Sequence, residues 1–581
     1  MIEDLHKPVE EYKSYLKDAH ARNTAALFEE LVKKSSVDEA TNIQTNIEIR
    51  TLETKIFNGN SYGKKWRTFR LIAFALLIAS AYFVSDQYSI WWIMGPIVVF
   101  APVIYKISRI IAEANTRVEQ LEKERNAKLD EAWAQMASLN NLYDWDAVSK
   151  LVQQTMPRIE LDPYFTNGRL AELHNIFGLN DEFNHDDRSI IFSHSGVING
   201  NPFVLARTLE HSMGWQTYHG SLNISWTEWE TDSDGHSTTV TKHETLHASV
   251  TKPYPNYCND TFIIFGNEAA PDLSFSRQPS NLSKLDDGFF DNFRKKRAVK
   301  LLEKKTRDLE NNFTIMSNRE FDSLFGATDR NHEVQFRLLF TPLAQQEMLN
   351  LLKDKEVGFG DSFEFEKKQM INMVTPSHMK LIDISGNPEL FHSYDITSAR
   401  IFFNVYHHYL FKSLFFGIAP ILAIPLYQQH RSHVDIYKDS DSSKSCFWEH
   451  EAIANYFGGE SFEHPSCITK SILKTQSKTR SDGTQEVRVT ASGFRGESRT
   501  DFVSVRGGDG HSHKVSVDWT EYLNVQNESK ILLKEKTSSE MNNAFSENSA
   551  ADWGRLLERK GVGAQDVVLR RSILSALLPN N

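Results

Sequence analysis

The stretch SLNISWTEWETDSDGHSTTVTKHETLHASVTKP, residues 221–253, decides the fold of the region around it. Before the tetrapeptide DSDG at 232–235 it carries Trp226 and Trp229, and after it the stretch is rich in threonine. Side chains alternate with a period of two, and the tetrapeptide favours a tight turn. The stretch therefore predicts an antiparallel β-hairpin. An apolar strand is predicted to follow at Phe262–Phe265.

This β pattern extends over residues 161–398, which we expect to form an α+β domain with a dominant antiparallel sheet. SHSGVINGNPFVLART, residues 193–208, places an Asn-Gly turn between two apolar runs and predicts another hairpin. Downstream, the residue patterns predict a charged helix over 287–312, a strand at Gln335–Phe340, a helix at Pro342–Lys353 and strands near Phe363 and Met370.

Residues 431–536 predict a second, smaller β-rich domain with two hairpins. The first joins Ile472–Thr479 to Glu486–Thr490, and the second joins Asp501–Val505 to His513–Trp519 around the glycine-rich turn at 507–510. Residues 537–581 follow as a polar linker, 537–550, and an amphipathic helix, 553–578.

Two uncharged apolar runs lie nearer the N-terminus, LIAFALLIASAYFVS at 71–85 and QYSIWWIMGPIVVFAPVIY at 87–105. A bilayer core needs about 20 mostly apolar residues per helix, so residues 67–109 predict a transmembrane helical hairpin. Residues 1–66 before it predict amphipathic helices, and residues 110–160 after it predict a helical stalk. The alternative is a helical hairpin buried in a large core.

Basic residues lie on both sides of this hairpin, and the connection carries only Asp86. The positive-inside rule then puts both ends in the cytoplasm, including residues 1–66 and 110–398. Residues 399–430, with the apolar run Ser413–Gln429, predict a third crossing that would place the C-terminal domain outside the cytoplasm. A re-entrant or core segment is the alternative.

Composition narrows the possible functions. The chain has 581 residues and 65 Lys+Arg against 76 Asp+Glu, a net charge of −11. A general nucleic-acid binder needs basic surface, so no nucleic-acid partner is expected. Only three cysteines occur, so the chain is not a disulfide scaffold.

The segment His243-Glu-Thr-Leu-His247 matches the H-E-x-x-H motif of zinc proteases. That motif binds zinc only on a helix, where residues four apart share a face. Its surroundings alternate with the period of a strand, in which four steps of about 3.3 Å separate the two histidines by about 13 Å. We therefore expect histidines of a surface strand here.

A second candidate site pairs Cys446-x3-His450 with His464-x2-Cys467. In a reducing compartment the four side chains suit a structural zinc site. If the third run crosses the membrane, Cys446 and Cys467 instead suit a disulfide. Two free buried thiols are the remaining alternative.

Three stretches carry a family resemblance: SGVINGNPFVLART, NREFDSLFGATDRNHEVQFRLLFTPLAQQEMLNLLKD and FEFEKKQMINMV. Over residues 71–374 the chain resembles bacterial membrane-anchored proteins with domain of unknown function 3137. The resemblance implies a transmembrane hairpin followed by a cytoplasmic α+β domain at the bacterial inner membrane, and a LemA-type membrane protein as a partner. It carries over no catalytic residue.

Taken together, these patterns predict a membrane-anchored α+β protein with the lipid bilayer among its partners. The leading function is binding or scaffolding, with α+β domains presented at the membrane. The alternative is a metal-dependent hydrolase that uses the β-region histidines His243 and His247. Whether the chain is an enzyme stays open at this point.

Overall fold

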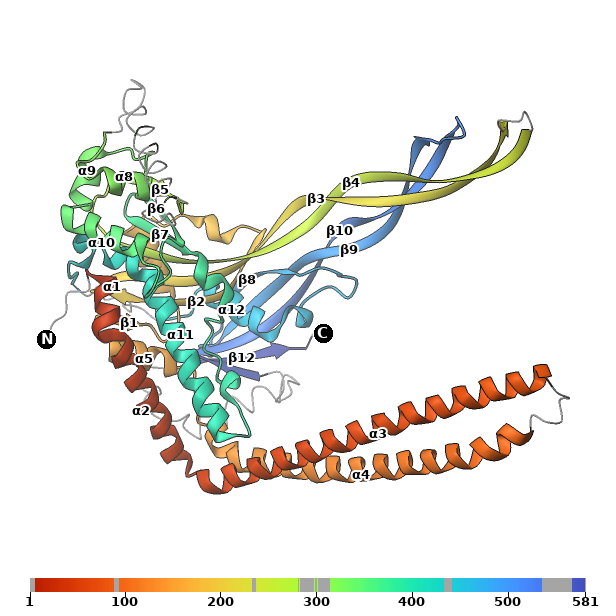
Figure 1. Cartoon of the computed structure of the whole chain (residues 1–581). Helices are drawn as coiled ribbons and strands as arrows, with labels where there is room; N and C mark the ends of the chain where they lie inside the picture. The colour runs from red at the N-terminus through yellow and green to blue at the C-terminus, as the bar shows by residue number, and fades with distance from the viewer. Residues whose placement is uncertain are drawn as a thin grey trace. The chain divides into compact units, whose positions relative to one another are not determined.

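The computed structural model describes residues 6–87, 94–231, 237–280, 314–432, 441–535 and 567–579, together with Leu282, Arg297 and Lys300 (Figure 1). The chain divides into two compact units, each assembled from separated segments. Unit 1 comprises Met1–Ala19, Val148–Ser385 and Leu410–Asn581, and unit 2 comprises His20–Ala147 and Gly386–Tyr409. The α+β class predicted from the sequence is confirmed, with two antiparallel sheets in unit 1.

Unit 2 is helical. Its helices are most of α2 (Lys17–Ser35), then α3 (Glu39–Gln87), α4 (Met94–Asn140), η5 (Pro388–Phe391) and the first half of α11 (Ile396–Leu422). The predicted amphipathic face of the N-terminal helices is confirmed, because Leu27, Leu31 and Val32 pack against the aromatic residues Phe391 and Phe403.

Helices α3 and α4 pair along their length, and Gly59 allows this close approach because a Cβ atom there would lie 2.7 Å from Val118. Of the predicted stalk over 110–160, residues 110–140 continue α4 as one helix, whereas the rest of that range includes a separate helix, Ala147–Thr155, and the start of a strand, Ile159–Leu161. However, none of the helices in the described ranges has both the length and the apolar character needed to cross a membrane. The transmembrane hairpin over 67–109 is therefore wrong, since the described parts of the two apolar runs, 71–85 and 94–105, are the ends of longer, mostly polar helices.

The predicted third crossing over 399–430 is also wrong. Ser413–Gln429 forms the end of α11 and the short helix η6 (Pro425–Gln428), and it is mostly buried within unit 1. Tyr12 packs against Phe415 and Phe416 with ring centroids 5.3 and 5.0 Å away. Burial in a protein core explains the apolar run. The inner-membrane localisation predicted from these segments, including export of the C-terminal domain, is therefore wrong as well.

The first sheet of unit 1 has the order β1-β2-β3-β4-β7-β6-β5 and is antiparallel throughout. Its two predicted hairpins are confirmed. Asn199 and Gly200 turn the chain between β2 and β3 with φ of 51° and 80°, in the left-handed region that Asn and Gly tolerate. The strands are β1 (Ile159–Leu161), β2 (Arg188–Ile198), β3 (Asn201–Thr231), β4 (Ser237–Gly266), β5 (Ser274–Arg277), β6 (Phe363–Lys368) and β7 (Ile371–Pro376).

The second sheet has the order β11-β12-β10-β9-β8, and both predicted C-terminal hairpins are confirmed. The predicted C-terminal helix is wrong where it is described, because β12 pairs with β10 and completes this sheet. The rest of that helix and the linker 537–550 lie outside the described residues. The strands are β8 (Ile472–Thr479), β9 (Gln485–Arg506), β10 (Ser512–Glu535), β11 (Val567–Arg570) and β12 (Ile573–Leu578).

Short helices surround the sheets of unit 1. The predicted helix at Pro342–Lys353 is confirmed, with Thr341 as its N-cap. The predicted strand at Gln335–Phe340 is wrong, because the His332 side chain caps a helix there and Phe336 and Leu339 bury one face of it. Of the predicted helix 287–312, only Arg297 and Lys300 are described, and both are helical. The elements are α1 (Pro8–Glu11), η1 (Tyr12–Leu16), α5 (Ala147–Thr155), α6 (Asn167–Asn175), η3 (Asp181–Asn184), α8 (Arg319–Phe325), α9 (Glu333–Leu339), α10 (Pro342–Lys353), η4 (Ser377–Leu381), α12 (Phe447–Phe457) and η7 (Gly459–Ser461).

Helix α12 joins the two sheets. Trp448, on one side of the helix, packs into the core of the first sheet with Phe165 and Phe262. Ile453 and Ala454 belong to the core of the second sheet. The helix therefore buries one face on each sheet.

Candidate binding surface

Two long hairpins extend beyond the sheets of unit 1 and pack on one another (Figure 1). Strand β2 pairs with β3 only as far as Glu210, so the chain beyond it pairs with β4 alone. Likewise, β9 and β10 continue beyond their pairings with β8 and β12. We call the four extended segments, residues 211–231, 237–257, 493–506 and 512–529, the β arm.

The faces on which the two hairpins meet form the inner seam of the β arm. Its buried centre is apolar and consists of Leu246, Ala248, Val515 and Val517. Gly220 faces the second hairpin, where an added Cβ atom would lie only 2.0 Å from the carbonyl oxygen of Ser516. Glycine is therefore required for the backbones to approach this closely.

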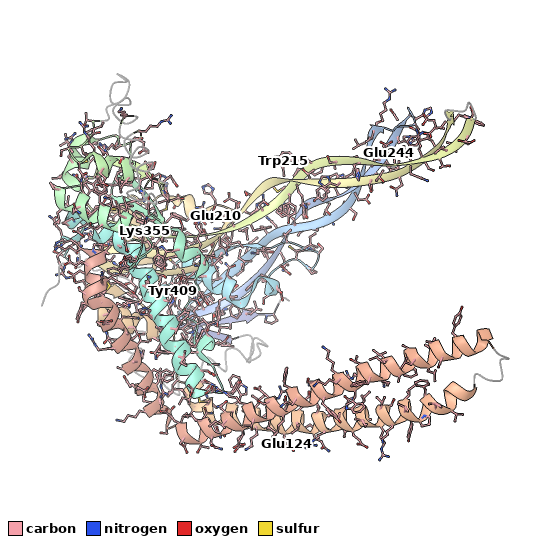
Figure 2. The ribbon with its side chains drawn as sticks, viewed as in Figure 1. Glu124, Glu210, Trp215, Glu244, Lys355 and Tyr409 are labelled. Atoms are coloured by element: carbon pink, nitrogen blue, oxygen red, sulfur yellow. The ribbon has the colours of Figure 1, made fainter. Side chains whose placement is uncertain are left out.

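Polar contacts close the inner seam at both ends. The Glu244 carboxylate accepts a hydrogen bond from the Gly508 N–H at 2.6 Å, toward the free end of the arm (Figure 2). Lys252 lies 2.6 Å from the Asp501 carboxylate and 4.2 Å from the centroid of the Trp519 ring. These contacts fix the register between the hairpins.

The opposite side of the β3–β4 hairpin, which we call the outer face, is exposed and carries no ionised Asp, Glu, Lys or Arg. Trp215 and Trp229 are 74% and 72% exposed. Between them lie hydroxyl, amide and imidazole groups, some joined across the strands, such as Thr217 to Thr251 at 3.1 Å. The outer face consists of Trp215, Thr217, His219, Ser221, Asn223, Ser225, Thr227 and Trp229 on β3, and Thr239, Thr241, His243, Thr245, His247, Ser249, Thr251 and Pro253 on β4.

The predicted strand histidines lie on this outer face. His243 is paired with Ser225 and His247 with Ser221, and both histidines are exposed. The interpretation of H-E-x-x-H as part of a strand is confirmed, and a helical zinc-protease site is thereby excluded. The sequence reasoning missed His219 and the two tryptophans on the same face, although the alternation that placed His243 on a strand extends to them.

The second predicted site is not assembled in one place. Cys446 is the N-cap of α12, and the His450 N–H donates to its carbonyl oxygen, so these two residues lie together and are buried. His464 and Cys467 occupy a separate turn, in which the Cys467 thiol contacts the carbonyl oxygen of Thr469 at 3.3 Å.

Both cysteines are free thiols in this structure, and burial raises the pKa of Cys446. Burial lowers the pKa of His450 to about 4, so its imidazole is neutral. Within the described ranges, no three His, Cys, Asp or Glu side chains converge as metal ligands. The zinc site and the disulfide remain predictions from the sequence.

A buried charged cluster, which we call the base layer, lies around α12. Glu449 on α12 is fully buried and receives bonds of 2.7 Å from both Arg570 and Arg571. Its other oxygen accepts from the Ser193 hydroxyl on β2. Nearby, the Glu451 carboxylate lies 2.7 Å from the Lys474 ammonium group.

Burial shifts the ionisation of the base layer. It raises the pKa of Glu451 to about 7, against the opposing effect of Lys474, and it lowers the pKa of Arg570 to about 10. Arg571 also adopts a left-handed backbone with φ of 40°, which holds its guanidinium group against Glu449. No local sequence pattern could have paired these residues, which are 121 and 122 positions apart.

Comparison of the chain with known protein families, curated proteins and solved structures finds no match.

Proposed function

We propose that this chain is a binding or scaffolding protein that presents the outer face of its β arm to a macromolecular partner. The observation that carries the proposal is the pair of exposed tryptophans, Trp215 and Trp229, at the two ends of an uncharged face. Tryptophan is strongly enriched among residues that dominate binding energy at protein interfaces, and charged residues are depleted there.

The support behind the outer face favours the same function. Two strands alone are marginally stable in water, but here the second hairpin buries Leu246 and Ala248 from behind. A face held in place before binding loses little conformational entropy when a partner docks. The arm therefore suits recognition by a preformed surface.

The hydrolase alternative depends on the same histidines. His243 and His247 lie four strand positions apart, about 13 Å, which one metal ion cannot bridge with nitrogen bonds of about 2 Å. Metal analysis of the purified chain separates the two functions. Stoichiometric zinc that is lost in the His243→Ala and His247→Ala variants would favour the hydrolase.

Photo-crosslinking in the native host tests the binding proposal. A photoreactive residue at Thr217 or Thr245 is expected to give discrete protein adducts, because both positions lie on the outer face. The matched control is Lys478, an exposed position on β8 outside the arm. The LemA-type protein implied by the family resemblance is the first candidate to identify among the adducts. Equal labelling from all three positions, or none, would contradict the proposal.

A further inference from the structure

The outer face is uncharged and carries a tryptophan in its first and last rows, so its two ends resemble one another. Each row is a β3 residue and its paired β4 residue, and the middle of the face lies at the pair Leu222–Leu246. At equal distances from this middle, three pairs of positions carry the same side chain, namely Trp215 and Trp229, Thr217 and Thr227, and Thr251 and Thr241, and the other five pairs differ. From one end, the rows are Trp215–Pro253, Thr217–Thr251, His219–Ser249, Ser221–His247, Asn223–Thr245, Ser225–His243, Thr227–Thr241 and Trp229–Thr239.

We infer that the outer face docks on the outer face of a second copy of this chain, with the two β3 strands antiparallel. This inference rests on the proposed function, because the same face does the binding. A two-fold axis through the middle of the face, lying between the copies and perpendicular to the strands, relates the two arms. Such isologous pairing is the commonest symmetry of soluble oligomers.

The antiparallel arrangement brings complementary groups together. Trp215 of each copy faces Trp229 of the other, so both exposed aromatic side chains become covered. The hydroxyl of Thr217 faces that of Thr227. His219 faces Ser225, which matches an imidazole nitrogen with a hydroxyl group that can donate or accept.

The rows on β4 match in the same way. His243 faces Ser249, and Thr241 faces Thr251. The two-fold axis therefore pairs imidazole with hydroxyl on both strands.

The lack of charge permits self-docking. A face carrying one sign of charge meets the same sign on a second copy, and like charges at an interface disfavour binding strongly. Here the rows between Trp215 and Trp229 contain only neutral polar groups when the histidines are unprotonated. The charged side chains of this hairpin, such as Lys242 and Glu244, lie on its opposite side.

The size of the face sets the strength of the dimer. Fourteen strand steps of about 3.3 Å give a length of about 46 Å, and two strands give a width of about 10 Å. The paired faces then cover about 900 Å² in total, below the usual 1,200–2,000 Å² of a stable complex. We therefore expect a reversible dimer with a Kd in the micromolar range.

Two double variants test the arrangement by sedimentation velocity of the full chain. They differ only in the sign of the charge introduced at Thr227. Thr217→Lys with Thr227→Lys places lysines opposite each other in the dimer and is expected to weaken it about tenfold or more. Thr217→Lys with Thr227→Glu places opposite charges together and is expected to restore it. Within one chain these positions are about 33 Å apart, well beyond the screening length of about 8 Å at physiological salt.

The control variant carries Ser477→Lys and Thr479→Lys on exposed positions of β8, and it should associate like the unchanged chain. A chain that stays monomeric up to about 200 µM would overturn the inference, since that exceeds a micromolar Kd many times. Equal weakening in both Thr217/Thr227 variants would also overturn it. Adducts with a different protein from a monomeric chain would leave the proposed function standing, whereas absence of any adduct would remove both.

Discussion

The two sheets of unit 1 meet in two places that are built from opposite chemistry. At the base layer, α12 lies between the sheets, and Glu449 binds two buried arginines from the second sheet. Along the inner seam the sheets touch directly, through aliphatic side chains such as Leu246 and Val517. Ion pairs demand one partner in one geometry, whereas an apolar seam tolerates changes that preserve volume. The base layer therefore specifies which elements join, and the inner seam stabilises the join.

The largest effect is expected from Glu449→Gln, which leaves two buried guanidinium groups without a carboxylate. Breaking a buried ion pair from one side costs about 3–5 kcal/mol in the free energy of unfolding. Denaturant unfolding measures this loss. Glu528→Gln is the matched control, because Glu528 lies 3.9 Å from Arg488 at an exposed site and should change little. Equal free energies of unfolding for the two variants would contradict the special role of the buried ion pairs in the base layer.

The base layer should also respond to pH. The pKa of Glu451 is raised to about 7, so the folded state binds a proton more tightly than the unfolded state, whose carboxyl has a pKa of about 4.3. Its contribution is fully present below the unfolded value and is lost as pH rises through about 7, on the order of 3 kcal/mol.

Unfolding of the unchanged chain and of Glu451→Gln between pH 4 and 8 measures this contribution. We expect the stability of the variant relative to the unchanged chain to rise over that range. A constant difference would show that Glu451 does not titrate between these values.

A smaller loss of stability is expected at the inner seam. Neighbouring residues of β4 lie on opposite faces there, so one of them serves as the control for the other. Leu246→Ala removes a side chain that is 3% exposed and should cost about 2–3 kcal/mol, because it leaves a cavity between the hairpins. His247→Ala, one residue further along on the outer face, should change stability by less than about 0.5 kcal/mol. Thermal unfolding compares the two. Similar losses from both would contradict the division of β4 into two faces.

The smallest effect is expected from Gly220→Val, which forces the hairpins apart without removing any contact group. Overpacking costs about 1–3 kcal/mol, and the thin arm relaxes more easily than a closed core, so about 1 kcal/mol is expected. Ser221→Val on the outer face is the matched control and should be near neutral. Hydrogen exchange of the β9–β10 amides reports the separation directly, and unchanged protection there would count against the close approach at Ser516.

Local patterns predicted the strands of this molecule well and its long-range burial poorly. Alternation and turn residues located both hairpins of the arm, and a proline in the first turn located the helix at Pro342–Lys353. The run Ser413–Gln429 is apolar on every side, a property shared by membrane segments and core helices. Only the elements packed around it, such as Tyr12 and Met379, reveal that it lies in a core.

The residues of the candidate site divide in the same way, into those that local patterns predict and those that depend on long-range packing. The strand position of His243 followed from nearby residues, and the outer face with its tryptophans was within reach of the same reasoning. The pairing of Glu449 with Arg570 was not, because it depends on how the last strands fold back onto α12. The C-terminal helix was mistaken for the same reason, since β12 becomes a strand by pairing with β10.

The separation of Glu449 from its arginine partners has a consequence for synthesis. Arg570 follows Glu449 by 121 positions. At about 5–20 residues per second, a ribosome takes about 6–24 s to add that length of chain. During this interval α12 carries an unneutralised carboxylate that disfavours its burial between the sheets. Unit 2, whose last segment ends at Tyr409, can meanwhile assemble. The complete base layer therefore requires that the final strands of unit 1 have been made.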